Sequence, residues 1–448
     1  MVFTHRSRSV LGVAVAAAAA LLLAGCVSTG DETAGSTSDG ATSLAPQTVT
    51  WWGWNAFNSD QAIADFEAAN PGVTVDFKLY SYDDYVTALR TGLTSDDGPD
   101  VFQLQPGDLV TNFGPLAAPL GDYLTEAHGA DWSDRVNPQG LSQLQLDGAQ
   151  VALPSYMSAA GFIYYNATIL DDLGVTVPTD FEQWKAACAT IEQAGYQCLA
   201  HGAKDPWVNT DVYLSLINSI EPGVVYDAIE GKVPWTDPQL VQAMQSWQDL
   251  FTSGIIPSGA TAMAEYPDAF SAFLEKKAAF IALGTWNTPG TETATGIAVS
   301  QKTVTAEIDS VYLSAPFPAP VTGDAPTAPF GGPDNGWAVS ANSKSMDAAY
   351  AFVDFLSVGD GQKIQAAGGN IPGVVDVPVA TDDVVDPRQV TDIEQQQKAL
   401  TTLIGARQIP YSDLAAALGD ALSAVAAGTS SPADAMKQVE SVSSSITR

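Results

Sequence analysis

The sequence predicts an α/β protein with a doubly wound parallel sheet, in which the chain is divided between two bodies. Segments typical of strands and helices alternate from Thr48 to Gln105, and such alternation implies parallel crossovers. The 448 residues exceed what one ordinary core accommodates. The stretch 148–166, GAQVALPSYMSAAGFIYYN, joins two β-prone runs through Pro154 and small residues. We expect the chain to pass between the two bodies there; one hairpin inside a single domain is the alternative.

The first part of the chain predicts a sheet edge suited to binding. Strands are expected at 48–52, 73–80 and 100–105, with helices beginning at Ser59 and Tyr82 between them. Ligands of doubly wound sheets bind beyond the carboxyl ends of the strands. The candidates placed at that edge are Trp54, Asn55, Gln105 and Asp108. Asp108 is equally well placed to cap the short helix expected at 109–113.

The remaining elements follow from local patterns. We expect a strand at 150–153 that Pro154 interrupts, a strand at 161–165, and a helix opened by a capping box of Thr179 and Glu182. A return strand is expected at 196–200, and 311–317 is a second crossing between the bodies. A loop at 329–335 leads into a strand at 336–340. The other elements expected are a strand at 278–283 and helices at 238–253, 264–277, 347–356, 394–403, 412–427 and 431–442.

The first 25 residues have the pattern of a secretory signal. Arg6 and Arg8 precede an apolar run that ends in Leu-Ala-Gly before Cys26. This ending resembles the lipobox of bacterial lipoproteins, which implies lipidation of Cys26; an ordinary signal peptide with a chance cysteine is the alternative. Residues 26–46 are rich in Ser, Thr, Gly and Asp, which is typical of a flexible linker. No other run is long and apolar enough to span a bilayer.

Two cysteines, Cys188 and Cys198, follow Cys26 in the chain. In an oxidising compartment they predict a disulfide. No histidine lies between them, and the chain has only three, so a metal site at this pair is not expected. The formal net charge is −33, and −35 once Arg6 and Arg8 are removed. This charge argues against nucleic acid and against electrostatic attachment to anionic lipid; most of the acidic residues are expected on a solvated surface.

Ordered motifs along the chain together resemble the extracellular solute-binding proteins of ABC importers, in the carbohydrate-binding group called family 1. They are the lipobox, TVTWWGWN at 48–55, Asn70-Pro71-Gly72, GPDVF at 98–102, Tyr164-Tyr165-Asn166, Gly174 with PTDFEQW, Phe273 before AAFIALGTW, Gly331-Gly332, Gly361-Gln362 and Gly369-Asn370-Ile371-Pro372. Two departures are Lys276-Lys277 before the AAFIALGTW strand and Ala167-Thr168 after Asn166. Neither touches the expected ligand site.

The resemblance implies a two-lobe, periplasmic-binding-protein-like fold with hinge strands and a ligand cleft between the lobes. Lobe 1 is expected at 47–156 and 315–357, and lobe 2 at 157–314 and 358–448. A sugar site needs flat aromatic surfaces beside fixed hydrogen-bonding groups. A tryptophan at such a position is alternatively a core residue, and Asp334 alternatively caps a turn. The implied ligand-binding residues are Trp54, Asn55, Gln105, Asp108, Tyr156, Asp205, Trp207, Trp286, Asp334, Asn335 and Trp337.

The expected function is a non-enzymatic receptor that delivers a mono- or oligosaccharide to a membrane permease. We expect a monomer without metal or cofactor, anchored through Cys26 to the outer face of the cell membrane. A polyamine, metal or peptide is the alternative ligand, since Asp108, Asp205 and Asp334 lie among aromatic residues, although His128 and His201 are not visibly grouped. A glycan-cleaving enzyme is a further alternative; it needs two carboxylates about 5–10 Å apart, and no motif selects such a pair.

Overall fold

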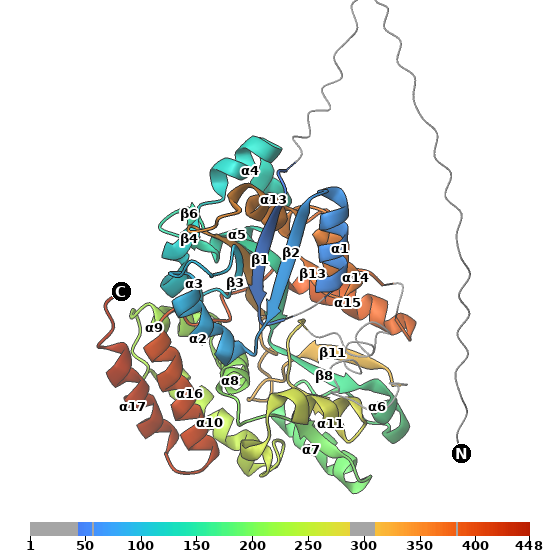
Figure 1. Cartoon of the computed structure of the whole chain (residues 1–448). Helices are drawn as coiled ribbons and strands as arrows, with labels where there is room; N and C mark the ends of the chain where they lie inside the picture. Colours follow the sequence, from blue (N-terminus) through green and yellow to red (C-terminus); the bar gives the residue numbers. More distant parts are fainter. Residues whose placement is uncertain (1–43, 56–57, 287–309, 382–383) are drawn as a thin grey trace, which may run out of the picture. The chain divides into compact units, whose positions relative to one another are not determined.

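The computed structural model describes residues 44–55, 58–286, 310–381 and 384–448 (Figure 1). The signal segment 1–25, the lipidation site Cys26 and the linker up to residue 43 lie outside the described residues. No helix in the described ranges is long and apolar enough to cross a membrane.

The first sheet has seven strands and combines a parallel part with antiparallel additions. β1 (Gln47–Gly53) pairs in parallel with β2 (Val73–Leu79) on one side and with β3 (Val101–Leu104) on the other, as the alternating pattern predicted. β12 then runs antiparallel to both β3 and β7. The strand order is β13 (Ile371–Pro372), β7 (Leu153–Ala160), β12 (Phe330–Ser340), β3 (Val101–Leu104), β1 (Gln47–Gly53) and β2 (Val73–Leu79), with β4 (Ala117–Ala118) paired to β12.

Two local expectations in this sheet are wrong. The chain does not break at Pro154, because β7 continues through it, and the predicted loop at 329–335 belongs to β12. The pairing of β7 with β12 shifts register between Pro333 and Asn335 and again between Asn335 and Gly336, which is paired with Pro154. Such irregularities let a ladder include a proline, which lacks the N–H that regular pairing uses.

Helices on the first sheet follow the βαβ pattern. The first helix begins at Ser59, but its N-cap is Asn58 instead of the expected Ser59. A short hairpin of β5 (Gln145–Leu146) and β6 (Ala149–Gln150) precedes β7. The helical segments of this part are α1 (Ser59–Ala69), α2 (Tyr82–Gly92), α3 (Asp108–Phe113), η1 (Gly114–Leu116), α4 (Gly121–His128), η2 (Trp132–Arg135), α5 (Pro138–Ser142), α13 (Met346–Ser357) and α14 (Gly361–Ala367).

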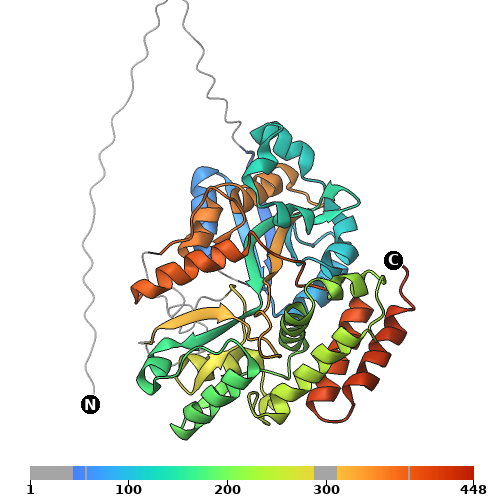
Figure 2. The same ribbon diagram turned by 180° about the vertical axis from the view of Figure 1, so that it is seen from behind.

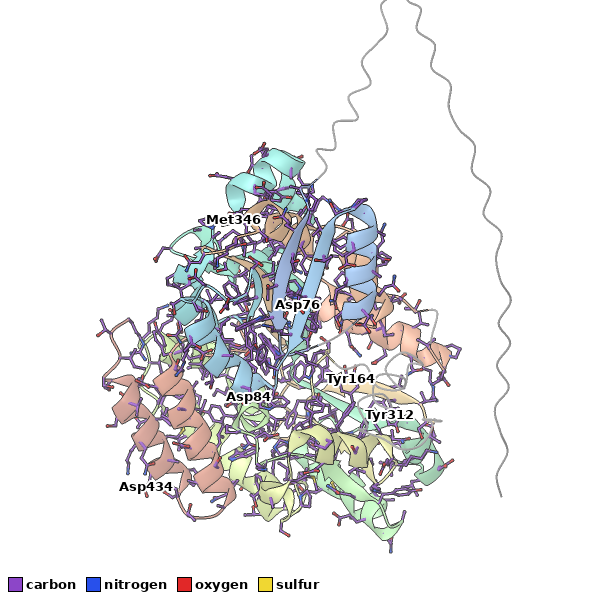
Figure 3. All side chains as sticks on the ribbon, viewed as in Figure 1. Asp76, Asp84, Tyr164, Tyr312, Met346 and Asp434 are labelled. Carbon is purple, nitrogen blue, oxygen red and sulfur yellow. A yellow bond between two sulfur atoms is a disulfide. The ribbon has the colours of Figure 1, made fainter. Side chains whose placement is uncertain are left out.

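The second sheet has four strands in the order β11 (Tyr312–Pro316), β8 (Phe162–Asn166), β10 (Ala278–Ile281) and β9 (Gln197–Ala200). Tyr164 and Tyr312 lie on its neighbouring strands β8 and β11, whereas Asp76 lies on β2 of the first sheet (Figure 3). The Tyr312 hydroxyl donates to the Leu274 carbonyl, 2.9 Å away, which fastens the helix before β10 to the sheet.

The chain passes from the first sheet to the second through one residue, Gly161, between β7 and β8. Its φ of 96° is a left-handed conformation that glycine adopts without strain. The chain returns between Pro316 and Phe330, and it leaves the first sheet again after Pro372. The lobe boundaries were expected at 156/157, 314/315 and 357/358. The first two lie within a few residues of Gly161 and Pro316, where the chain leaves one sheet for the other, and the third lies more than ten residues before Pro372.

Helices α10, α16 and α17 pack together and, with α8, form the carboxyl-terminal layer over the second sheet (Figures 1 and 2). The helix expected over 264–277 is shorter, and it consists of a π-helical segment followed by α11. The helical segments are α6 (Ala167–Leu173), α7 (Phe181–Gln193), α8 (Pro206–Ile220), α9 (Val224–Ile229), α10 (Pro238–Thr252), η3 (Ala260–Ala262), η4 (Glu265–Ala269), α11 (Phe270–Leu274), α15 (Pro387–Ala399), α16 (Ser412–Ala426) and α17 (Pro432–Ser443).

Helix α7 shows how a cap and a cross-link fix one element. Its N-cap is Asp180, whose carboxylate accepts from the Gln183 N–H at 2.9 Å, one residue beyond the expected Thr179. Asp180 is the N-cap because its carboxylate is a stronger acceptor at a helix N-terminus than the hydroxyl of Thr179. Near its other end, Cys188 forms a disulfide with Cys198 of β9, with the Cα atoms 5.0 Å apart.

The core contains most of the ten tryptophans. Six of them are buried: Trp51, Trp52, Trp184, Trp235, Trp247 and Trp337. Of these, the Nε1 atom of Trp247 donates to the Leu422 carbonyl at 2.9 Å, while the other five indole N–H groups have no partner among the described residues. The indole rings therefore stabilise the core mainly through buried apolar area and edge contacts such as that of Trp51 with Trp337.

Candidate ligand-binding site

The carboxyl ends of β1 and β3 bring together several predicted residues. The Trp54 ring packs against Tyr82 and Tyr85, with ring centroids 5.4 and 5.1 Å apart, and the Trp54 backbone N–H donates to Gln103 Oε1 at 2.8 Å. Gln103 is fully buried and donates through Nε2 to Asn335 on β12 at 3.1 Å. Through this pair, the hydrogen bonds that begin at Trp54 after β1 extend to β12 in the middle of the sheet.

The outer predicted residues at that edge make weaker links. Gln105 accepts from the Tyr82 hydroxyl at 3.1 Å, and Asn55 is half-buried after β1. Asp108 is the first residue of α3, whose N-cap is Gly107, so the alternative of an Asp108 cap is wrong. Burial raises the pKa of Asp108, and the Ser412 hydroxyl lies 3.5 Å from its carboxylate.

Arg407 forms the centre of the site, and sequence reasoning missed it. Its Nε donates to both carboxylate oxygens of Asp211 at 3.0 and 3.1 Å, and its Nη1 donates to Asp334 at 3.3 Å. All three side chains are nearly buried, with exposed fractions of 11–12%. Asp211 lies on α8, among the helices of the second sheet, and Asp334 lies on β12 of the first sheet. The guanidinium of Arg407 therefore links the parts of the protein built on the two sheets.

The position of Asp334 follows from the irregularity in β12. Asp334 lies between Pro333 and Asn335, where the register with β7 shifts. A bulge of this kind redirects a side chain next to a functional site. The carboxylate of Asp334 accepts from the Tyr156 hydroxyl at 2.7 Å and from Asn335 Nδ2 at 3.2 Å. The predicted residues Tyr156, Asp334 and Asn335 therefore form one connected group.

The carboxylates of Asp211 and Asp334 stabilise the charged form of Arg407, and Arg407 in turn favours the charged form of Asp211. Burial works against the charged form of Arg407, but the carboxylates of Asp211 and Asp334 outweigh it and raise its pKa. Burial raises the pKa of Asp211, while Arg407 opposes that shift. Burial, with Asp334 adding to it, also holds the pKa of Tyr156 well above its usual range. The phenol therefore stays neutral and donates its hydrogen bond.

An aromatic surface lies beside Arg407. Trp207 and Tyr266 are 36% and 40% exposed, and their rings are within 10° of parallel with centroids 6.1 Å apart. Trp207 lies four residues before Asp211 on α8, so both face the same side of that helix. The Nε1 atom of Trp286 donates to the Tyr266 hydroxyl at 3.2 Å. These three rings come from three separate segments of the chain.

The guanidinium covers one of these rings. The Cζ atom of Arg407 lies 3.9 Å from the centroid of Trp286 and 5.6 Å from that of Trp207. A cation over an indole face is favourable, by about 0.5–2 kcal/mol. Arg407 thus covers a face of Trp286 closely and lies farther from Trp207, while Trp207 and Tyr266 keep more than a third of their surface exposed.

Two other predicted residues lie outside this contact group. Trp337 is 2% exposed and packs in the core of the first sheet against Trp51, so its expected ligand contact is not available in this structure. Asp205 has a structural partner: its Oδ2 accepts from the Glu265 N–H at 2.8 Å, which links the turn before Trp207 to the segment carrying Tyr266.

No group of three or more metal-ligating side chains occurs within the described ranges. A cavity of about 320 Å³ lies away from Arg407, around Thr48, Lys78, Asp100 and Lys344. The Asp100 carboxylate there already accepts from the Thr50 N–H and the Ser343 hydroxyl. The residues around Arg407 supply flat rings, one fixed cation and fixed acceptors, which suits non-covalent binding of a polar ligand.

The fold and the site define a class of binding protein with two α/β lobes. Residues 58–363 match the family of bacterial extracellular solute-binding proteins, and the chain belongs to that family. The expected family and fold are thereby confirmed.

Individual relatives agree with this assignment. The chain is 24% identical to the multiple sugar-binding protein of Streptococcus mutans over 303 residues, 66% of each chain. It is also 24% identical to a putative binding protein of Brucella abortus over 201 residues, 44% of this chain and 47% of the relative, so the match spans about half of that relative's length. A solved chitin oligosaccharide binding protein has the same fold, with a TM-score of 0.73 at 19% identity over 89% of this chain and 98% of that chain.

Proposed function

We propose that the protein is the substrate-binding component of an ABC importer, which binds a mono- or oligosaccharide between its lobes and delivers it to a membrane permease. The observation that carries this proposal is the open pair of Trp207 and Tyr266 beside fixed polar groups. The flat C–H face of a sugar ring packs on such rings, while its hydroxyls need donors and acceptors at the rim. The relatives include proteins named for binding sugars and oligosaccharides, which supports the same ligand class.

The arrangement of Arg407 favours a sugar over a polyamine. A polyamine needs carboxylates that are free to pair with its amines. Asp211 and Asp334 are already paired with Arg407, and Asp205 is bonded to the backbone of Glu265. The same pairing disfavours a glycan-cleaving enzyme. That chemistry needs one protonated and one free carboxylate across the bond, whereas the carboxylates of Asp211 and Asp334 are both bound by one guanidinium.

The attachment to the membrane belongs to the same proposal. Lipidation of Cys26 and processing of residues 1–25 rest on the lipobox, and the linker 26–46 provides the distance to the folded body. The protein is then an extracytoplasmic, monomeric receptor, and it releases its ligand without chemical change.

Titration calorimetry with mono- and oligosaccharides, polyamines and amino acids tests the proposal. We expect a carbohydrate to bind with micromolar affinity, about −8 kcal/mol, and to be recovered unchanged after incubation. Trp207→Ala should weaken binding by about 2 kcal/mol, or about thirtyfold. Trp286→Ala should abolish the ligand-induced shift in melting temperature, because it removes the support of both Tyr266 and Arg407.

Tyr350→Ala provides the matched control. Tyr350 also lies in a parallel aromatic pair, with Tyr123 at 4.9 Å and 10°, but this pair belongs to the first sheet's helices. Its removal should leave carbohydrate affinity unchanged. Binding of a polyamine and of no sugar, or hydrolysis of the bound saccharide, would reject the proposed function.

A further inference from the structure

Glu265 is a fully buried acid that the ligand contacts described above do not use. It is the first residue of η4, and its side chain has no exposed surface. Its Oε2 accepts from the Gly202 N–H at 2.7 Å, while its Oε1 has no hydrogen-bond partner among the described residues. A buried acid with an unsatisfied oxygen is costly, so its position calls for a physical reason.

The backbone around Glu265 joins the two segments that carry the open rings. Its N–H donates to Asp205, which directly precedes Pro206 and Trp207, and its chain neighbour is Tyr266. A bridge between Ala203 and Ala264 adds to this link. Glu265 therefore contacts the turn before Trp207 on one side and leads directly into Tyr266 on the other.

The two segments are in close contact at Gly202. A Cβ atom added at Gly202 would lie 2.1 Å from the Glu265 backbone nitrogen and 2.3 Å from its Cα. The two segments therefore pack backbone against backbone at this point, and the Gly202 N–H also donates to the Glu265 carboxyl. We expect a displacement of Glu265 to affect the turn before Trp207 and the Tyr266 segment together.

The surrounding charges oppose ionisation of this acid. Burial raises the pKa of Glu265 to about 8, the Gly202 N–H opposes the shift, and the carboxylates of Asp205 and Asp211 add to it. The guanidinium of Arg407 is bonded to Asp211 and Asp334, and no ion pair of Glu265 occurs among the described residues. The other titratable groups on these segments are Tyr266, the exposed Lys204, the buried His201, and Asp268, whose carboxylate accepts from the Ala264 N–H.

We infer that Glu265 is a positioning residue for the ligand site: its neutral carboxyl holds the turn of Trp207 and the Tyr266 segment together, and its ionisation loosens the two rings and weakens ligand binding. This inference rests on the proposed function for its ligand, and it concerns how the binding surface is assembled. Neutral Glu265 needs no counter-ion, whereas the ionised form lies buried beside the carboxylates of Asp205 and Asp211, and moving the segments apart would hydrate it.

The test compares ligand affinity between pH 6 and pH 9.5 for three proteins, using the tightest carbohydrate found by calorimetry. If only the neutral form binds, wild-type affinity is flat up to about pH 7.5 and falls about tenfold by pH 9, since the competent fraction is then about one tenth. Glu265→Gln, which keeps the shape without the titration, should retain wild-type affinity at pH 6 and hold it to pH 9.5. Glu221→Gln, at an exposed carboxyl beyond the other end of α8, should follow the wild-type profile.

Two results overturn the inference: wild-type affinity that stays flat to pH 9.5, or a Glu265→Gln variant that keeps the wild-type pH dependence. If the Glu265→Gln variant does not fold, a measurement on ligand-free wild-type protein still tests the inference. The near-ultraviolet circular dichroism of unliganded wild-type protein should change with a midpoint near pH 8, and a constant spectrum from pH 6 to 9.5 would reject the role of Glu265. Failure of every carbohydrate to bind would reject the proposed function, while this spectrum would still decide the role of Glu265.

Discussion

Replacing Arg407 by alanine is expected to destabilise the protein strongly, because the substitution leaves two buried carboxylates without a cation. The guanidinium makes three hydrogen bonds to Asp211 and Asp334 and covers the face of Trp286 at 3.9 Å. Removing one partner of a buried ion pair costs about 3–5 kcal/mol, most of it the penalty of the charge left behind. The lost cation–π contact adds about 0.5–2 kcal/mol. We therefore expect the free energy of unfolding to fall by about 4 kcal/mol or more.

Arg388 offers a matched control, because it also binds two carboxylates, those of Asp386 and Asp171. Its side chain is 47% exposed, against 11% for Arg407. Exposed pairs of this kind contribute about 0–1 kcal/mol. Arg388→Ala should therefore shift the urea unfolding midpoint little, while Arg407→Ala shifts it far.

Urea unfolding of both variants at pH 7 and pH 4 measures the difference. Burial raises the pKa of Asp211 and Arg407 opposes that shift, so without Arg407 the Asp211 carboxylate takes up a proton more readily and the loss in Arg407→Ala should shrink at pH 4. Equal losses in the two variants, or a loss in Arg407→Ala below about 1 kcal/mol, would refute the reasoning from burial.

Two further predictions concern stability. Replacing Cys188 and Cys198 by serine should lower the free energy of unfolding by about 2–3 kcal/mol, the cost of opening so short a loop; urea unfolding checks this, and a reductant should bring the wild type to the same midpoint. Burial lowers the pKa of His201 to about 4, so the unfolded chain binds a proton below pH 6.5 that the folded chain refuses. The contribution of His201 to the free energy of unfolding should be complete above pH 6.5 and decline toward pH 4 by up to about 1.4 kcal/mol per pH unit. Glu265, with a pKa raised to about 8, adds a slope of the opposite sign, so the measurement is the difference in slope between the wild type and His201→Gln; an unchanged slope in the variant would contradict the prediction.

Local patterns predicted the parallel part of the first sheet, because strands β1 to β3 and their helices are each determined by neighbouring residues. The all-buried β12 was harder to predict. Every residue from Phe330 to Ser340 is buried, so no alternation of polar and apolar residues marks the strand, and the sequence Gly331-Gly332-Pro333 suggested a loop. Trp337 was misplaced for the same reason.

Residues of the site that follow β1 and β3 were predicted from the local pattern, whereas Tyr156, Asp334 and Asn335 were predicted from the family resemblance. Arg407 lies between α15 and α16, 196 residues from Asp211 and 73 from Asp334 in the chain. No local pattern connects such distant residues, and a lone arginine in a loop usually faces solvent. The scarcity of cations, 18 among 448 residues, was the one signal available.

The burial of the tryptophans gives the protein an intrinsic optical probe. Indoles enclosed in apolar surroundings emit at shorter wavelength than hydrated ones, and six of the ten tryptophans are enclosed in this way. Trp207 is the tryptophan with the most solvent contact in the described part of the chain, so the red edge of the emission spectrum reports mainly on that ring. A solute that covers Trp207 should shift this edge to the blue, so that unlabelled protein can be screened by fluorescence alone.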